Sequence, residues 1–232
     1  MLRLHSRAKI ITFIGPVGVG KSTQMRLIQN RFRSCGVRTI TTYLKSSHAL
    51  AYILTKFLKG IGAYEEVKYA DGFRIYPRRD IMKRLFPLYC FLDAMSVAVK
   101  FLLTICVPYA LDFVILLEEG PIMNLHTYAE VMPWLYGTRP IVLPLVPNLV
   151  GWIEDRNHVN IILDADELEL NERRRMRSFR RSELLEYERL QRNWVHRFRG
   201  EKTFFVDTRG LSIGQVQKQV VQTLGRDYGI KE

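Results

Sequence analysis

The 232-residue sequence predicts a single α/β domain, in which helices cover both faces of a five-stranded parallel sheet. Three observations predict this fold. Short apolar or β-branched runs alternate along the chain with segments of helical periodicity. The runs are of the kind expected when both faces of a parallel sheet are buried. A glycine-rich loop separates the first run from the first helical segment. A hydrophobic content of 47% supplies a full core for residues 1–232.

The first predicted strand, residues 9–14, and the first predicted helix, residues 22–33, enclose this loop. Residues 15–22 have the sequence Gly-Pro-Val-Gly-Val-Gly-Lys-Ser, which matches the P-loop pattern G-x-x-x-x-G-K-[ST]. Glycines let such a loop turn its N–H groups inward around a triphosphate, and the helix N-terminus adds a partial positive charge. Strand, loop and helix in this order predict a P-loop NTPase fold.

The residue types of the P-loop assign roles at the nucleotide. We expect the Lys21 ammonium to reach the β- and γ-phosphates and the Ser22 hydroxyl to hold Mg²⁺. The sequence has no Asn-Lys-x-Asp motif for reading guanine, so ATP is the expected nucleotide. The residues expected to bind ATP are Gly15, Gly18, Gly20, Lys21, Ser22 and Thr23.

The region after the first helix contains a second strand and a long apolar helix. The β-branched run 38–44 predicts a strand, and residues 49–58 predict a helix. Residues 60–76 mix glycines with aromatic residues, and we expect this segment to contain loop. Pro77 suits the first turn of a helical stretch, which continues at 88–106 as an apolar helix buried on several sides.

The apolar region around this helix raises the question of a membrane span. Charged residues interrupt it, and its longest charge-free piece, residues 101–111, is too short to cross a bilayer. The basic residues 1–8 lead directly into the first strand and are not expected to act as a signal peptide. We therefore expect no membrane span and a cytoplasmic protein.

The second half of the chain completes the predicted sheet. Residues 113–117 predict a buried strand that meets Glu118 and Glu119, and a helix is expected at 124–136. Three prolines favour a loop or an extended segment at 138–148. The remaining predicted elements are strands at 159–163 and 203–206 and a closing amphipathic helix at 213–224.

Three carboxylates are candidates for catalysis. A carboxylate at the end of a buried strand beside a P-loop can hold the Mg²⁺ shell, so Glu118 joins Ser22 as a metal candidate. Glu119 is a candidate for orienting an acceptor or a water molecule. The alternative is that both acids cap a strand at the surface. Asp93 lies alone in an apolar helix, where it needs either a catalytic role or a structural partner, and both remain open.

Residues 171–199 are rich in arginine and predict a lid. Phosphoryl transfer spreads negative charge over the transferred group, which arginines brought in by closure would stabilise while excluding water. Arginines alternate along residues 173–177 and cannot all face the phosphates. Arg173 and Arg177 are the catalytic candidates. The alternatives are a solvated basic helix face and a nucleic-acid surface.

The overall charge indicates the kind of partner, and the cysteines indicate the redox state and the absence of a cysteine metal site. A net charge of +12 favours anionic partners, such as nucleotides, nucleic acid or an acidic membrane surface. Cys35, Cys90 and Cys106 are scattered and form no C-x-x-C pair, so we expect reduced thiols and no metal site built from cysteine.

Several segments match one family in order along most of the chain. They are Gly20-Lys21-Ser22-Thr23-Gln24, Phe91-Leu92-Asp93-Ala94 followed by Val107-Pro108-Tyr109-Ala110, Ile161-Ile162-Leu163-Asp164 followed by Glu172-Arg173-Arg174-Arg175-Met176-Arg177, and Phe205-Val206-Asp207. In these segments the sequence resembles the thymidylate kinase branch of the P-loop nucleoside monophosphate kinases. The resemblance implies ATP-dependent phosphoryl transfer to a nucleotide or nucleoside, with dTMP to dTDP as the default reaction.

The sequence departs from this family on the acceptor side. Residues 118–120 read Glu-Glu-Gly where the family carries Asp-Arg-Tyr or Asp-Arg-His, and Ala94 replaces an arginine. Residues 44–46 read Leu-Lys-Ser in place of the Arg-Glu-Pro segment. At least two phosphate-binding arginines are therefore missing. The residues able to substitute for them are Arg74, Arg78, Arg79 and Arg139.

Two alternatives to a kinase follow from the same residues. The double acid at 118–119 also resembles the strand ending of ATP hydrolases, where the second acid polarises water, so an ATPase or switch without a small acceptor is one alternative. The other is a catalytically degenerate protein that binds nucleotide or nucleic acid. The expected partners are ATP and an acceptor nucleotide or nucleoside, with a homodimer as an option and nucleic acid less favoured.

Overall fold

A computed structural model describes residues 9–46, 49–69, 72–175, 184–197 and 202–228. A five-stranded sheet with the order β2-β5-β1-β6-β7 lies at its centre, and all four strand pairings are parallel. The predicted α/β fold and parallel sheet are confirmed. The strands are β1 (Ile10–Ile14), β2 (Thr39–Tyr43), β5 (Val114–Glu118), β6 (His158–Asp164) and β7 (Thr203–Asp207).

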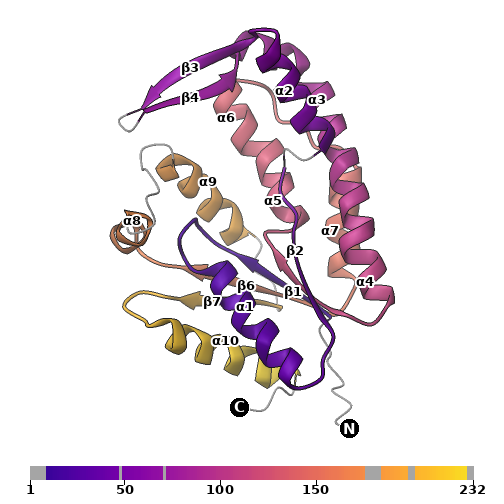
Figure 1. The fold of residues 1–232 in the computed structure, drawn as a ribbon, viewed down its shortest axis with the longest axis vertical. Coiled ribbons are helices and arrows are strands. Elements are labelled where there is room, and N and C mark those ends of the chain that lie inside the picture. The colour runs from indigo at the N-terminus through magenta and orange to yellow at the C-terminus, as the bar shows by residue number, and fades with distance from the viewer. Residues whose placement is uncertain (1–8, 47–48, 70–71, 176–183, 198–201, 229–232) are drawn as a thin grey trace.

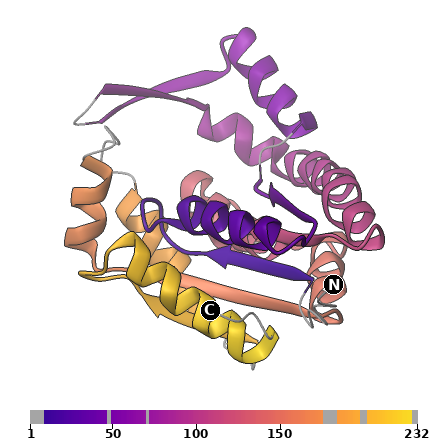
Figure 2. The same ribbon diagram turned by 60° about the horizontal axis from the view of Figure 1, so that its bottom comes forward.

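Helices cover both faces of this sheet (Figures 1 and 2). Alternate residues of a strand point to opposite faces, so each strand contributes to two cores. In β5, Leu116 packs into the core beneath α1 and α10, whereas Ile115 and Leu117 pack against α3 and α7. The helices of these layers are α1 (Lys21–Ser34), α3 (Arg79–Phe101), α4 (Val107–Ala110), α7 (Leu145–Glu154) and α10 (Ile213–Tyr228).

The register of the strands brings three carboxyl ends to one edge of the sheet. In the pairing of β1 with β5, Phe13 lies opposite Glu118, and in the pairing of β2 with β5, Tyr43 lies opposite the same residue. The loop that follows β1 therefore lies beside the residues that follow β2 and β5. In open α/β sheets, ligands bind at this edge, beyond the carboxyl ends of the strands.

A hairpin and a group of helices extend from one end of the sheet, as Figure 1 shows at the top. The segment 60–76, which we expected to contain loop, has a turn at 61–62, but most of it pairs as the antiparallel hairpin of β3 and β4, which we did not predict. Gly60 and Gly62 precede the hairpin and Gly72 begins its second strand, whereas all residues of its first strand are aromatic, β-branched or charged. We call this part of the molecule the helical layer; the first part of α3 packs within it. Its other elements are α2 (Ala49–Gly60), β3 (Tyr64–Tyr69), β4 (Gly72–Pro77), α5 (Pro121–His126), the π-helix η2 (Thr127–Val131) and α6 (Met132–Tyr136).

One other expectation, that of a loop or an extended segment at 138–148, needs correction. The proline-containing segment 138–148 is helical from Leu145 onward, since Pro147 falls in the first turn of α7, where a missing N–H costs nothing. The arginine-rich segment forms α8 (Glu167–Arg175) and α9 (Leu184–Arg197), and residues 176–183 lie outside the described part of the chain.

The long apolar helix is buried on one side only. From Arg79 it continues through the π-helix η1 (Leu102–Cys106) to Ala110, and its 32 residues are long and apolar enough to cross a membrane by length and composition. Its most apolar 18-residue window has a mean hydropathy of 2.0 and is 39% buried. The inner side forms part of two cores, but our expectation of burial on several sides is wrong for its outer side.

Candidate nucleotide site

The P-loop connects β1 to α1 in a conformation that requires its glycines. Gly15, Gly18 and Gly20 have φ angles of +150°, +92° and +105°, a region that side chains disfavour. A Cβ atom on Gly15 would also lie 2.1 Å from the backbone oxygen of Leu163 in β6. Close packing of the loop against the neighbouring strand therefore adds to the conformational requirement.

The Lys21 ammonium lies buried against this loop. Its Nζ donates hydrogen bonds to the backbone oxygens of Gly15 at 2.7 Å and Pro16 at 3.2 Å. The Glu119 Oε1 lies 3.7 Å from the same nitrogen. Burial lowers the pKa of Lys21, and the carboxylates of Glu119 and Glu118 oppose that shift. The site thus holds a cation with carbonyl and carboxylate partners for which a bound anion could compete.

Ser22 and Glu118 meet at the carboxyl end of β5. The Ser22 hydroxyl donates a hydrogen bond of 3.0 Å to Glu118 Oε2. Hydroxyl and carboxylate oxygens are the ligands that Mg²⁺ prefers, usually together with water and substrate phosphates. The two residues proposed from sequence for the metal are therefore adjacent, and their donor atoms fit Mg²⁺.

Glu119 has an unusual backbone and two lysine neighbours. Its φ of +73° is rare for a residue with a side chain, and its N–H donates to the Phe13 oxygen at 3.0 Å, which ties the residue to β1. The buried carboxylate lies 3.3 Å from Lys45 Nζ as well as near Lys21. Strain of this kind is often found at functional sites. The alternative of two acids capping an exposed strand end does not describe Glu119, which is buried.

Lys45 is a site residue that sequence reasoning missed. It follows β2 by two residues, and its side chain is 44% exposed beside Glu119. The family comparison singled out its segment only for lacking the Arg-Glu-Pro sequence. The available signal was positional, because β2 and β5 are both strands whose carboxyl ends precede charged residues, and such ends converge in a parallel sheet.

Arg173 connects the arginine-rich segment to the P-loop. Its guanidinium donates to the backbone oxygen of Val19 at 3.5 Å, to both oxygens of Thr208 at 3.0 and 3.1 Å, and to Glu169 at 2.6 Å. Arg173 therefore joins α8, the P-loop and the loop after β7. Arg177, the other arginine candidate, lies outside the described residues.

A cavity of about 250 Å³ opens next to Arg173 and the P-loop. Its volume is close to the lower end of the range for small-molecule sites, and it is lined by both backbone and apolar side chains. The cavity adjoins the P-loop and the first turn of α1. The lining residues include Gly18, Val19, Gly20, Thr23, Arg173 and Leu211.

Gln191 is a second residue that sequence reasoning missed. Its side-chain nitrogen donates to the Gly15 oxygen at 3.2 Å, and the residue is buried. It lies in α9, within the segment that we considered only for its arginines. Through this contact α9 touches the phosphate loop, and Arg192 beside it pairs with Asp164 at the end of β6.

Asp93 lies in the helical layer with a structural partner. The Tyr128 hydroxyl donates a 2.7 Å hydrogen bond to Asp93 Oδ2, and both residues are fully buried among apolar side chains such as Tyr89. Burial and the neighbouring Asp93 carboxylate raise the pKa of Tyr128. The π-helix η2 carries Tyr128, so the pair joins α3 to the segment that follows α5.

The arginines considered as substitutes on the acceptor side are dispersed. Arg78 forms an exposed ion pair of 2.8 Å with Asp80. The Arg79 guanidinium lies against Gly137, and Arg139 is exposed. The side chain of Arg74 is outside the described part of the structure. None of these contacts links an arginine to Glu119.

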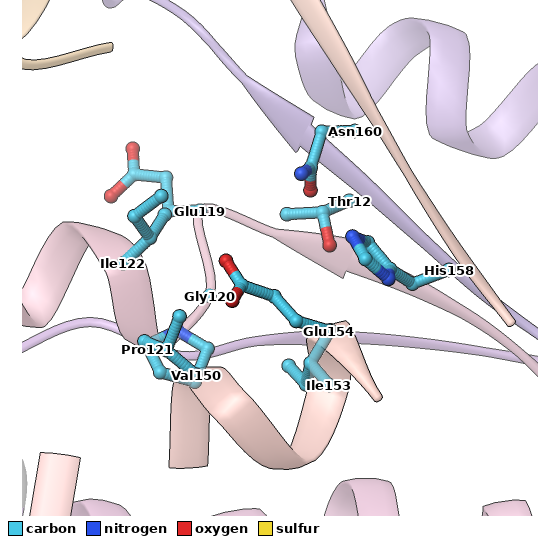
Figure 3. Close-up of a pocket in the computed structure, with 10 residues that line it drawn as sticks. All are labelled: Thr12, Glu119, Gly120, Pro121, Ile122, Val150, Ile153, Glu154, His158 and Asn160. Carbon is cyan, nitrogen blue, oxygen red and sulfur yellow. The ribbon is translucent and has the colours of Figure 1, made fainter. Parts of the chain in front are cut away.

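A small pocket lies behind Glu119, between the sheet and α7. Its volume is about 20 Å³, enough for one water molecule, so it cannot hold a nucleotide. Figure 3 shows the Glu154 carboxylate pointing into this pocket on the side of Gly120, while the Glu119 carboxylate points away from it. The Glu119 side chain therefore faces the edge of the sheet that carries the P-loop.

Comparisons with known proteins identify the fold. No protein-family model matches the chain, and no curated protein sequence matches it. Its structure is similar to thymidylate kinase from Candida albicans, with a TM-score of 0.58 and 12% identity over 97% of this chain and 94% of that one. It is also similar to thymidylate kinase from Ehrlichia chaffeensis, with a TM-score of 0.53 and 15% identity over 93% of this chain and 97% of that one. The fold is thymidylate kinase-like along nearly the whole chain.

Proposed function

We propose, from a thymidylate kinase-like fold that carries a complete P-loop motif, that the protein is an ATP-dependent kinase acting on a nucleotide or nucleoside. One observation carries the proposal. Lys21, Ser22 and Glu118 lie together at the carboxyl edge of the sheet, with the Ser22 hydroxyl 3.0 Å from the Glu118 carboxylate. Conversion of dTMP to dTDP is the first reaction to test.

Each residue on the donor side has a role in this proposal. The P-loop amides and the N-terminus of α1 bind the phosphates. The Lys21 ammonium exchanges its carbonyl partners for phosphate oxygens. Ser22 and Glu118 would hold Mg²⁺, which supplies charge neutralisation for the transferred phosphoryl group. Arg173 positions the loop through Val19 and borders the cavity for the base or sugar.

The acceptor side uses different residues from those expected in the family. Glu119 occupies the position of the missing arginine, and Lys45 restores a positive charge next to it. Lys45 is therefore the best-placed cation for an acceptor phosphate, and Glu119 is placed to accept a proton from an acceptor hydroxyl. We propose Asp93 as a support for this side through Tyr128 rather than as a residue that contacts substrate.

The lid is proposed for residues 171–199, with Arg173 at its described end and Arg177 as a further candidate for the phosphates. We also propose that the protein is cytoplasmic, because ATP and nucleotide acceptors are available in the cytoplasm.

An acceptor screen tests the proposal. ATP consumption is measured with dTMP, other nucleoside monophosphates, nucleosides and water alone. We expect turnover that depends on one acceptor class and falls at least roughly 100-fold in Lys21→Ala, because one preorganised cation at the phosphates contributes about this much. Lys59→Ala, which changes an exposed lysine of α2, is the matched control and keeps full turnover. Equal consumption with every acceptor and with water would exclude the kinase.

A second candidate function is ATP hydrolysis, favoured by the Glu119 carboxylate lying 3.7 Å from Lys21 Nζ. In that position it could polarise a water molecule at the γ-phosphate. Hydrolysis without acceptor that falls at least roughly 100-fold in Glu119→Gln would support this function over the kinase. Acceptor-free hydrolysis that is absent in the wild type would exclude it.

A further inference from the structure

The backbone oxygen of Gly15, the first residue of the P-loop, accepts hydrogen bonds from two side chains. Lys21 Nζ donates to it at 2.7 Å, and Gln191 Nε2 donates to it at 3.2 Å. Gly15 itself is buried against the backbone of Leu163 in β6. A carbonyl oxygen has two lone pairs and can accept both bonds at once. The oxygen therefore has one donor from α1 and a second donor from α9.

Binding of a triphosphate would remove only the first of these donors. In the proposed function, the Lys21 ammonium leaves its two carbonyl partners for phosphate oxygens. The second of those partners, the Pro16 oxygen, keeps the N–H of Val19 at 3.4 Å. The Gly15 oxygen keeps Gln191. A buried carbonyl that loses its donor costs free energy, so Gln191 lowers the cost of moving Lys21 to the phosphates.

The Gln191 side chain is buried at a cost that packing alone does not explain. The residue is 2% exposed, and its Oε1 meets no donor among the residues that the structure describes. An amide that is buried with one atom unpaired is unfavourable, and an apolar side chain of similar size avoids this cost. Only the orientation with Nε2 toward Gly15 gives a hydrogen bond to the carbonyl. The contact with the P-loop is therefore the interaction for which this position uses an amide.

Neighbouring residues of α9 hold Gln191 in place. Arg192 Nε donates to Asp164 Oδ1 at 3.1 Å, at the end of β6. Trp194 Nε1 donates to the backbone oxygen of Ile122 in α5 at 3.2 Å. These bonds join α9 both to the sheet and to the helix that follows the double acid of β5. The position of the Gln191 amide therefore does not depend on where Lys21 points.

We propose that Gln191 is a positioning residue of the ATP site, which holds the Gly15 carbonyl while Lys21 moves to the phosphates. This inference rests on the proposed binding of ATP and adds a residue to it. Gln191 acts through the P-loop and does not contact the nucleotide. Loss of its N–H donor should therefore weaken ATP binding without destabilising the free protein, in which Lys21 still satisfies Gly15.

Calorimetric titration of Mg²⁺·ATP into the wild type and Gln191→Met tests this role, because methionine keeps the length of the side chain without an N–H. We expect binding roughly tenfold weaker, the effect of a buried carbonyl left without a donor. The urea midpoint without nucleotide should be no lower than that of the wild type. Gln219→Met, at an exposed glutamine of α10, is the control and keeps wild-type affinity. Wild-type affinity in Gln191→Met, or a fall in affinity together with the urea midpoint, would overturn the proposal.

Urea unfolding without nucleotide tests the shared carbonyl separately from ATP. Lys21→Met and Gln191→Met each leave the Gly15 oxygen with one of its two side-chain donors, and the double variant removes both. We expect the midpoint of the double variant to lie roughly 0.5 M below the value that the single variants predict by addition. Additive midpoints would overturn the proposal.

The two experiments distinguish this inference from the proposed function. A wild type without affinity for Mg²⁺·ATP would overturn both. A wild type that binds Mg²⁺·ATP through Lys21, with unchanged binding in Gln191→Met, would overturn the role of Gln191 alone.

Discussion

Lys21 and Asp93 are both buried charged residues, and their surroundings differ in a way that separates a ligand site from a core. Lys21 lies at the open edge of the sheet, held by two backbone oxygens and a carboxylate 3.7 Å away. Asp93 lies in the helical layer, where a tyrosine hydroxyl 2.7 Å away satisfies it among apolar side chains. The first set of partners can be exchanged for a ligand, and the second is fixed.

The two residues also differ in how their surroundings affect the free energy of folding. Burial lowers the pKa of Lys21, so the folded state carries its charge at a cost that the nearby carboxylates offset only in part. The fully buried Asp93 carboxyl accepts a 2.7 Å hydrogen bond from the Tyr128 hydroxyl, and loss of either group would leave a buried polar atom without this partner. A costly charge retained at the carboxyl edge of a parallel sheet indicates function, whereas a satisfied charge inside an apolar layer indicates packing.

The largest effect is expected from alanine in place of a glycine in the P-loop. Gly15→Ala places a Cβ 2.1 Å from the Leu163 oxygen at a φ of +150°, and should lower the free energy of unfolding by about 3 kcal/mol or more. In the helical layer, Gly60→Ala meets open space at the end of α2 and should change it by less than about 1 kcal/mol. Urea unfolding of both variants measures the contrast, and similar values would contradict it.

Next in size is the removal of the buried carboxylate. Asp93→Ala leaves the Tyr128 hydroxyl without this partner in an apolar cluster and should cost about 3 kcal/mol of unfolding free energy. Adding Tyr128→Phe to it should recover part of that loss, since the stranded hydroxyl is then gone. Chemical denaturation of the two single variants and the double variant gives the coupling. If the losses of the two single variants add up to that of the double variant, Asp93 and Tyr128 do not stabilise the fold as a pair.

A smaller effect is expected in the pH dependence of stability, through a histidine at the contact between α5 and α9. His126 in α5 is fully buried beside the Trp194 ring, and burial, reinforced by Arg197, lowers its pKa to about 4. Between pH 6.5 and 4 the unfolded chain binds a proton at this residue that the folded chain does not, so stability falls as the pH falls. From pH 7 to pH 5 the loss should be about 2 kcal/mol.

Comparing the wild type with His126→Gln at both pH values isolates this contribution. The pKa of His158 is lowered by burial in the same direction, so the variant should keep part of the pH dependence. An unchanged pH dependence in His126→Gln would contradict the assignment.

The smallest effect on stability is expected at Lys21, to which we assign the main phosphate contact. Lys21→Met keeps the length of the side chain and removes a charge whose burial is unfavourable, while Glu119 keeps Lys45 as an ion-pair partner 3.3 Å away. Unfolding free energy should therefore change by less than about 1 kcal/mol. Thermal unfolding without nucleotide measures it. A loss as large as that of Asp93→Ala would remove the distinction between the two charges.

The sequence predicts the sheet well because its signals are local. An apolar run, a glycine-rich loop and an amphipathic helix can each be recognised within about 15 residues. The alternation of strands and helices then predicts a parallel sheet. The hairpin at 64–77 was not predicted, because the glycines at its margins are typical of loops. The choice between a catalytic and a structural Asp93 needed Tyr128, which lies 35 residues away.

The missed site residues share one cause. Lys45 and Gln191 reach Glu119 and Gly15 only through the packing of distant elements, and their own segments have no motif. The outer side of α3 is a similar case, because composition alone shows that a helix is apolar but not which of its sides the rest of the chain covers.

The central claim is that the edge of the sheet around Lys21 holds a magnesium-bound triphosphate while the Asp93 region only supports the fold. Calorimetric titration of Mg²⁺·ATP into the wild type, Lys21→Met and Asp93→Asn tests it directly. The account predicts that Lys21→Met weakens binding at least roughly 100-fold, as expected for loss of a buried charge-assisted contact, while Asp93→Asn binds within about threefold of the wild type. Equal affinity in the wild type and Lys21→Met, or a larger loss in Asp93→Asn, would contradict it.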